Sequence, residues 1–335
     1  MEYKLIRTIF YLAFLLFTIT GCSQDKGENP VIDGKITDNA QEPDKPEFVN
    51  YETFGTANNG RLNEISGMVA SVNNPGLFWV HNDSGDDPII YLVDDQMDIV
   101  QSVNLQNAVY NETVLDGNGN ESEITKVESI RSVDWEDITM TSIDEGNFIV
   151  VGDIGDNRAQ RKSVALYSFE EPIFDGSTEI SVTANKMIVK YAEGPRDAET
   201  LMSDPISGEL LIMTKRDPRS KIYSFPFVAK EMVIRSKGEL NLTPLIEDDG
   251  FTNTVVAGDI DRFGNLILKN YSHVFLLENP DKISALELLL GTTPKELNYI
   301  VEPQGESICW GLDLISYFTI SENRGGVPQP LFRYY

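Results

Sequence analysis

The 335-residue sequence contains only two cysteines and two histidines, and this scarcity excludes several kinds of site. A zinc centre needs several Cys or His ligands at close spacing, and a catalytic thiol needs a partner histidine. The positions of Cys22, Cys309, His81 and His273 match neither arrangement. Cys309 lies in an apolar run, so we interpret it as a packed core residue.

Basic residues are also scarce: 27 Lys and Arg stand against 53 Asp and Glu, which gives a formal net charge of −26. Such a surface repels a phosphate backbone, so we expect no nucleic-acid partner. The sequence also lacks a Gly-rich phosphate-binding loop before a helix and a Gly-x-Ser-x-Gly nucleophile turn. An acidic chain suits a protein that binds divalent cations, and the same excess of charge also serves solubility.

The longest apolar run without a charge lies at the N-terminus. It extends from Ile9 to Ile19, follows Lys4 and Arg7, and is too short to span a bilayer, which predicts an export signal. The run ends in Ile19-Thr20-Gly21-Cys22, which resembles the lipobox of bacterial lipoproteins. The resemblance implies a signal peptide of residues 1–21 and a diacylated Cys22 held to a membrane. An uncleaved N-terminal anchor is the alternative, and both place the remainder outside the cytoplasm.

Residues 22–47 comprise Cys22 and a polar, acidic, proline-containing segment with too few apolar side chains to fold. They predict a tether to a folded domain of residues 48–335. The acidic residues just after Cys22 resemble the export signal of surface lipoproteins in the Bacteroidetes. We therefore expect a cell-envelope protein, anchored to the outer membrane or cell surface rather than the inner membrane, and we expect a monomer.

The folded part consists of short runs rich in Val, Ile, Leu, Phe and Tyr, separated by Gly, Asp, Asn and Pro turns, as in many-stranded β proteins. Residues 284–290 predict the one short helix. A pattern of up to four strands, here a to d, recurs five times. Strands a are predicted at 64–71, 134–141, 197–204, 253–260 and 305–311; strands b at 77–86, 147–157, 209–217, 265–272 and 316–323; strands c at 89–94, 164–172, 221–226, 273–280 and 330–335; and strands d at 99–105, 186–192 and 232–240.

Radial repetition of four-stranded sheets predicts an all-β fold, the β-propeller. Five blades are visible, and the irregular stretch 106–133 leaves room for a sixth. Because the chain finishes on a strand c, residues 48–54 are predicted to supply the missing outer strand and close the ring. A β-sandwich or a β-solenoid is the alternative, and the recurrence of one strand order with matching motifs favours the propeller.

In an antiparallel blade the start of strand a and the turn from b to c lie at the same end, so their polar residues should meet at one mouth of the central channel. Two b–c turns share the motif Asp-x-Gly-Asp, and such carboxylates suit a hard cation such as Ca²⁺. The alternative is ordinary hairpin turns whose side chains bond their own backbone. The candidate metal ligands are Asp83, Asp86, Asp153, Asp156, Glu64 and Glu199.

The same mouth supplies candidates for catalysis and ligand binding. The catalytic candidates are His81 or Glu136 as a general base and Lys215 or Arg158 as a holder of an anion. The ligand-binding candidates are Asn82, Trp135, Asp137, Asn157, Arg216 and Glu306. A structural role that orients the turn stays open for His81, and a packing role stays open for Trp135.

Residues 116–123 begin with an Asp-x-Asn-x-Asn spacing that resembles the start of an EF-hand loop. Glu121 stands where that loop requires glycine, and Val127 stands where it requires a glutamate. We therefore interpret the segment as an acidic loop and not as a calcium site.

The run HNDSGD, DWEDI, GDIGDN and DAE resembles a little-characterised group of bacterial propeller proteins, near the esterase-like phytase and SdiA-regulated propellers. The resemblance covers residues 62–225 and implies the fold, not the substrate. The calcium motifs of β-propeller phytases are incomplete here, so phytase activity is not carried over. Two functions follow: a calcium-dependent hydrolase of an ester or phosphoester that binds a polar or anionic ligand, or a non-catalytic binding or scaffold propeller for glycan or protein partners.

Overall fold

The computed structural model describes residues 43, 47–83, 85–115, 118, 120–242, 245–246 and 252–335. The predicted signal peptide, Cys22 and nearly all of the predicted tether lie outside the described residues. So do Ser84 in the first Asp-x-Gly-Asp turn and most of the EF-hand-like segment. Within the described ranges, no helix has the length and apolarity needed to cross a bilayer.

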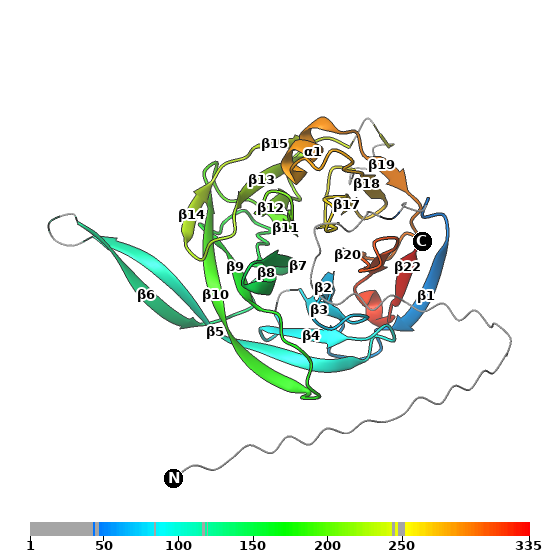
Figure 1. The fold of residues 1–335 in the computed structure, drawn as a ribbon, viewed down its shortest axis with the longest axis horizontal. Coiled ribbons are helices and arrows are strands. Elements are labelled where there is room, and N and C mark those ends of the chain that lie inside the picture. The colour runs from blue at the N-terminus through cyan, green and yellow to red at the C-terminus, as the bar shows by residue number, and fades with distance from the viewer. Residues whose placement is uncertain are drawn as a thin grey trace, which may run out of the picture. The chain divides into compact units, whose positions relative to one another are not determined.

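The described strands form five four-stranded blades (Figure 1). Blade 1 comprises β2 (Ile65–Ala70), β3 (Phe78–Asn82), β4 (Ile89–Val93) and β5 (Ile99–Leu115), and blade 2 comprises β7 (Trp135–Ile143), β8 (Gly146–Asp153), β9 (Val164–Glu170) and β10 (Glu179–Tyr191). Blade 3 comprises β11 (Ala198–Ser203), β12 (Glu209–Thr214), β13 (Ser220–Pro226) and β15 (Gly238–Leu240), and blade 4 comprises β16 (Ala257–Ile260), β17 (Leu266–Lys269), β18 (Val274–Leu277) and β19 (Lys295–Leu297). Blade 5 comprises β20 (Ser307–Trp310), β21 (Tyr317–Ile320), β22 (Pro330–Tyr334) and β1 (Tyr51–Thr56). The predicted all-β propeller is confirmed.

The ring closes in the way that the sequence predicts. The innermost strands contact one another in the order β2, β7, β11, β16 and β20, and β20 returns to β2. β1 pairs antiparallel with β22, with Tyr51 opposite Tyr334, and so completes the last blade with the first strand of the domain. The predicted helix is α1 (Ala285–Gly291), which begins at a capping box between Ser284 and Glu287. A 3₁₀ turn, η1 (Arg324–Gly326), precedes β22.

The described residues of 106–133, which left room for a sixth blade, form no blade. β5 continues to Leu115 and pairs with β6 (Glu121–Ser129), and this hairpin projects away from the ring (Figure 1). We call the paired segments Asn107–Leu115 and Glu121–Ser129 the arm. Its cross-strand pairs mix Glu, Asn, Thr and Lys with apolar residues, so neither face is apolar enough to pack against a neighbouring blade.

The predicted outer strand 232–240 is also corrected. It divides into β15, the outer strand of blade 3, and β14 (Glu231–Ile234), which pairs in parallel with β10 of blade 2. β10 pairs in parallel with β5 as well, so blades 1 and 2 form one continuous sheet. The 13 residues of β10 extend far enough to offer hydrogen-bonding groups to β5 along one part and to β14 along another.

The innermost strands are largely buried on both faces, although β7 and β11 carry acidic residues where they begin. Every residue of β2 and β11 is buried. The core lies between the faces of neighbouring blades, and Trp79 and Trp135 are the largest side chains between blades 1 and 2. Cys309 is fully buried between blades 5 and 1, as its apolar surroundings predict.

Buried aspartates join consecutive inner strands. The carboxylate of Asp137 on β7 accepts hydrogen bonds from the backbone N–H of Ile138 and, on β11, of Leu201, both at 2.8 Å. Asp259 makes the same pair of bonds from β16 to β20. Burial raises the pKa of Asp137 well above its usual value and that of Asp259 to about 7. Asp137, predicted to bind a ligand, is therefore engaged in joining two blades.

Replacing Asp137 should destabilise the ring, because Asp137→Ala leaves two buried N–H groups without acceptors. We expect a loss of about 2 to 4 kcal/mol in the free energy of unfolding, measured by urea denaturation. Asp144→Ala, in the exposed turn between β7 and β8, is the matched control and should leave the midpoint unchanged. Equal midpoints for the two variants would contradict this role of Asp137.

Candidate functional site

Local irregularities at the start of three inner strands bring acidic side chains to the mouth, the end of the channel where strands a begin and the b–c turns lie. The antiparallel register of β2, β7 and β11 shifts by one residue at Ser66, Glu136 and Glu199 respectively. Such a bulge re-aims the extra side chain out of the regular alternation of a strand. In β7 and β11 that side chain is a glutamate.

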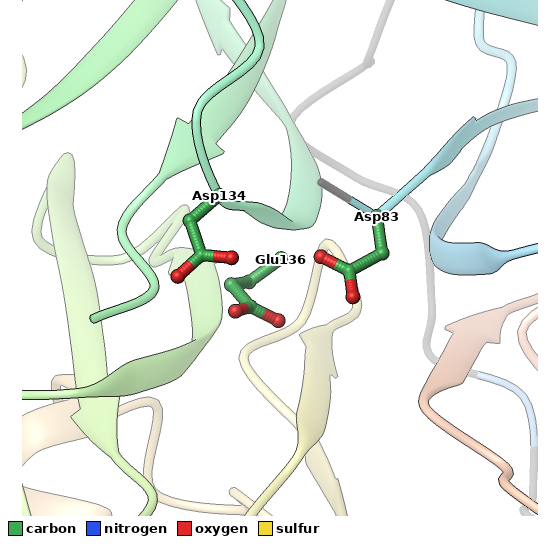
Figure 2. A group of neighbouring side chains, drawn as sticks. All are labelled: Asp83, Asp134 and Glu136. Carbon is green, nitrogen blue, oxygen red and sulfur yellow. The ribbon is translucent and has the colours of Figure 1, made fainter. Parts of the chain in front are cut away.

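Two groups of carboxylates meet at this mouth in the part of the chain that the structure describes. One consists of Asp83, Asp134 and Glu136, and the other of Glu136, Asp197 and Glu199. Within each group one carboxylate oxygen per residue lies within 4.8 Å of the others. Figure 2 shows the first group, with Asp83 facing Asp134 and Glu136 across a shared space. We call the residues of both groups the acidic cluster.

Three residues of the acidic cluster are buried and Asp83 and Asp134 are half-buried, which makes its negative charge costly. Glu136, Asp197 and Glu199 are at most 4% exposed. Burial raises the pKa of Glu136 well above its usual value, and the neighbouring carboxylates of Glu199, Asp83 and Asp134 raise it further. Burial likewise raises the pKa of Asp134. Like charges in a poorly solvated space cannot all be ionised without a compensating cation.

The donor set fits a hard cation. The hydrogen bonds of the described residues include none to the side-chain oxygens of Asp134 or Glu136, and Oε2 of Glu199 is buried without a hydrogen-bond partner. The backbone of Gly155 closes over the same space, since a Cβ there would clash with the carboxylates of Glu136 and Asp134. Buried oxygens without donors, and no nitrogen or sulfur ligand among them, are the ligands that Ca²⁺ and Mg²⁺ prefer.

Lys215 is the one buried cation that the described residues place beside the acidic cluster. Its Nζ pairs with Glu199 and lies 3.5 Å from Oε1 of Glu306, and the Tyr271 hydroxyl donates to the same oxygen at 2.6 Å. Burial raises the pKa of Glu199 to about 8 despite the pairing with Lys215. Glu199 and Glu306 in turn outweigh the burial of Lys215 and raise its pKa.

The side chains of Glu306 and Glu322 are hydrogen-bonded to each other at the same mouth. Burial opposes the charge on Glu306, but Lys215 and the hydrogen bond from Glu322 outweigh burial and lower its pKa. Burial and the neighbouring Glu306 carboxylate raise the pKa of Glu322 to about 9. The pair therefore consists of a carboxylate on Glu306 and a protonated acid on Glu322 at neutral pH.

The two Asp-x-Gly-Asp turns prove different in structure, although they match in sequence. Asp83 belongs to the acidic cluster, whereas Asp86 is exposed and accepts a bond from Asn82. In the second turn Asp153 pairs with Arg161 at 2.7 Å, and Asp156 accepts a bond from the backbone N–H of Arg161. The expectation that both turns supply ligands is therefore corrected: the second turn is fixed by Arg161.

His81 and Trp135 lie beneath the mouth. His81 is fully buried, its Nδ1 is 2.8 Å from the Asn82 carbonyl oxygen, and its ring meets Trp135 edge-on at 5.8 Å. Burial lowers the pKa of His81 to about 4, so the ring is neutral. Gly67 packs against it so closely that a Cβ would clash with Nε2. The structure thus places both residues, with Asn82, in positions that support the turn.

The remaining predicted residues lie around the rim. Arg216 pairs with Asp197 at 2.5 Å and donates to Asn157, whose side chain is exposed. Arg158 is exposed and makes no ion pair among the described residues, and Glu64 is exposed near Glu322. Sequence reasoning left Asp134 and Asp197 out of the ligand set. The shared spacing Asp-x-Glu in 134–136 and 197–199 is the signal that identifies them.

No protein-family model and no curated protein matches the sequence. Among solved structures, a luciferin-regenerating enzyme is 12% identical with a TM-score of 0.48, over 85% of this chain and 95% of that chain. A gluconolactonase from Xanthomonas campestris is 11% identical with a TM-score of 0.44, over 85% of this chain and 88% of that chain. Neither likeness carries information about activity at these values.

Replacing Lys215 should be costly, because Lys215→Met leaves Glu199 and Glu306 buried without their cation. We expect a loss of about 3 to 5 kcal/mol in the free energy of unfolding at neutral pH, measured by urea denaturation. The control is Lys221→Met, which removes a surface pair with Glu239 and should leave the midpoint nearly unchanged. A Lys215→Met midpoint equal to that of the control would show that Lys215 does not neutralise the mouth.

Proposed function

We propose that the acidic cluster binds a divalent cation. The observation that carries the proposal is the burial of Glu136, whose side-chain oxygens receive no hydrogen bond, and of Glu199, whose Oε2 receives none, beside Asp83, Asp134 and Asp197. These five ligands come from the b–c turn of blade 1 and the first residues of blades 2 and 3, so the site forms only where these three blades pack side by side. The cation would satisfy the charges that burial leaves uncompensated.

Calcium is the cation that this donor set favours. All the ligands are carboxylates, whereas zinc sites in proteins are built chiefly from nitrogen and sulfur. Ca²⁺ takes six to eight oxygen ligands in irregular geometry, and Mg²⁺ requires a near-ideal octahedron. Two groups of carboxylates that share Glu136 form an irregular set of the first kind.

The activity that this mouth would support is hydrolysis of an anionic ester or phosphoester. A cation bound there would polarise a carbonyl or phosphoryl oxygen. Glu322 holds a proton at neutral pH through its contact with Glu306, and so is placed to protonate a leaving group. Arg216, half exposed at the rim beside Asp197, is placed to contact an anionic substrate.

A non-catalytic binding propeller for a glycan or a protein is the second candidate. His81 is buried, and Lys215 forms ion pairs with Glu199 and Glu306. Two of the catalytic groups that the sequence suggests are therefore not free to contact a substrate, which favours this second candidate. Cation-dependent turnover that is lost in Glu322→Gln with the cation still bound supports the hydrolase. Cation binding with no turnover across ester and phosphoester substrates supports the second candidate.

The cation proposal is tested by thermal unfolding of chelator-treated full-length protein titrated with Ca²⁺. At roughly a hundred times the dissociation constant, Ca²⁺ should add about 2.7 kcal/mol to the stability. Glu136→Gln should abolish this response and also raise the stability of the cation-free protein, because it removes a carboxyl group whose ionisation burial and the neighbouring carboxylates disfavour. Asp86→Asn is the control and should respond as the natural protein does. A calcium response that survives in Glu136→Gln would overturn the site.

The affinity for the cation should depend on pH. Because burial raises the pKa values of Glu136 and Glu199, protons compete with the cation for these ligands. We expect the Ca²⁺ affinity to rise with pH and to level off above about pH 8, the pKa of Glu199. Isothermal titration calorimetry in buffers of different ionisation enthalpy measures both the affinity and the protons released. A pH-independent affinity with no proton release would contradict the assignment.

We also propose that the protein is anchored through a lipid on Cys22, which the N-terminal motif supports. The chain joins the ring next to Tyr51, which pairs with Tyr334, whereas Thr56 pairs with Pro330. Pro330 begins a strand c and so lies at the mouth, which puts Tyr51 at the opposite face. The described chain therefore enters the ring at the face away from the acidic cluster.

Replacing the lipidation residue should release the protein from the membrane. Cys22→Ser removes the thiol that would carry the acyl chains, so we expect the variant in the soluble fraction of lysed cells and without incorporated fatty acid. Cys309→Ala, which changes the buried cysteine, is the control and should stay membrane-bound. Membrane retention and labelling of Cys22→Ser equal to those of the control would contradict the anchor.

A further inference from the structure

A cavity of about 510 Å³ lies outside the central channel, at the foot of the arm. Its walls are the end of β6 and the segment that follows it on one side, and β9 and β10 of blade 2 on the other. Cavities of about 300 to 1,000 Å³ are the usual size for small-molecule sites. Among the candidate cation ligands, Asp153 alone lines this cavity, and it is paired with Arg161.

The described residues that line the cavity carry more positive than negative charge, in a chain whose net charge is −26. Arg161 pairs with Asp153 at 2.7 Å, and Lys186 pairs with Glu128. Arg131 is exposed at the cavity and has no ion pair among the described residues. The lining therefore has one positive charge without a counter-charge, which favours an anionic ligand.

A tyrosine also lines this cavity. Tyr167 is only 4% exposed, and its hydroxyl takes part in none of the hydrogen bonds of the described residues. A hydroxyl that bonds no protein group can donate to a bound ligand or to water. Lys186 lies over the same ring, 5.9 Å from its centroid, and holds it in place from the β10 side.

We propose that this cavity binds a small organic anion that carries several hydroxyl groups, such as a sugar acid or a sugar phosphate. The acidic group of the ligand pairs with Arg131 and lies near Arg161, whose Nη1 and Nη2 already donate to the Gly155 carbonyl oxygen and to Asp153. The hydroxyl groups of the ligand bond to Tyr167 and to the carboxylate of Glu128, which accepts from them. The mixture of cations, carboxylates and a phenol hydroxyl suits a ligand with both charge and hydroxyls, and a purely apolar ligand would leave these groups without partners.

The wall of the cavity is shared with the mouth. Oδ1 of Asp153, which pairs with Arg161, also accepts a hydrogen bond from the backbone N–H of Asp134 at 3.2 Å. Asp134 belongs to the acidic cluster. Asp153 therefore links Arg161, beside the proposed anion, to Asp134 of the proposed cation site. The anion itself uses none of the residues that would bind the cation.

The test is calorimetric titration of chelator-treated full-length protein with D-glucuronate, glucose 6-phosphate and, as the neutral control, D-glucose. We expect saturable binding of one or both anions and no binding of glucose, and the stronger anion identifies a carboxylate or a phosphate ligand. Arg131→Ala should weaken that binding about tenfold or more, and Tyr167→Phe severalfold. Lys190→Met changes an exposed lysine of the same strand, β10, that pairs with Glu231 outside the cavity, and should bind as the natural protein does.

Failure of this proposal is distinguishable from failure of the cation site, because the chelator removes divalent cations and Glu136→Gln should bind the anion normally. Absence of saturable binding of both anions would overturn the proposal. So would equal binding of glucose, or an affinity that neither Arg131→Ala nor Tyr167→Phe changes.

Discussion

The crowding of carboxylates at the mouth, three of them buried, is the constraint on which the rest of the structure depends. Glu136 and Glu199 reach that mouth because their strands bulge, and the strands hold their positions because the ring closes through β1 and β22. Asp137 and Asp259 bond one inner strand to the next. Lys215 neutralises one side of the mouth. The carboxylate oxygens of Asp134 and Glu136, which face Asp83, have no such cation beside them. A divalent cation bound there would compensate their negative charge.

Much of the fold could be predicted because a propeller repeats one strand pattern, and each repeat carries the same mixture of apolar runs and polar turns. The closing strand could be predicted because the chain ends on a strand c. β14 could not, because its partner β10 belongs to another blade. The arm could not, because its hairpin mixes polar and apolar pairs and lacks the alternation typical of a strand with one buried face. A strand at the rim of a blade can pair with any free edge within reach, and the sequence of one strand does not specify which.

The site could be located from topology, but the role of each residue could not. Two identical turn motifs predicted equal roles, yet Asp83 lies in the acidic cluster and Asp153 is held by Arg161, five residues beyond the end of the second motif. The position of His81 near the end of its strand could be predicted from the sequence. The direction of its side chain could not, because a residue next to a turn can point either toward solvent or into the core. Here it packs on Trp135. Burial and partners decide such cases, and both come from the neighbouring blade.

The central claim is that the mouth holds a divalent cation, and anomalous diffraction from crystals grown with Mn²⁺, a scatterer that takes the same oxygen ligands, tests it most directly. We predict an anomalous peak bonded to Glu136 and to at least two of the other carboxylates of the acidic cluster. Ca²⁺ in excess should remove that peak. A peak at Asp86 or on the arm with none at Glu136, or no peak at a cation concentration that saturates the protein, would show that the mouth does not hold the cation.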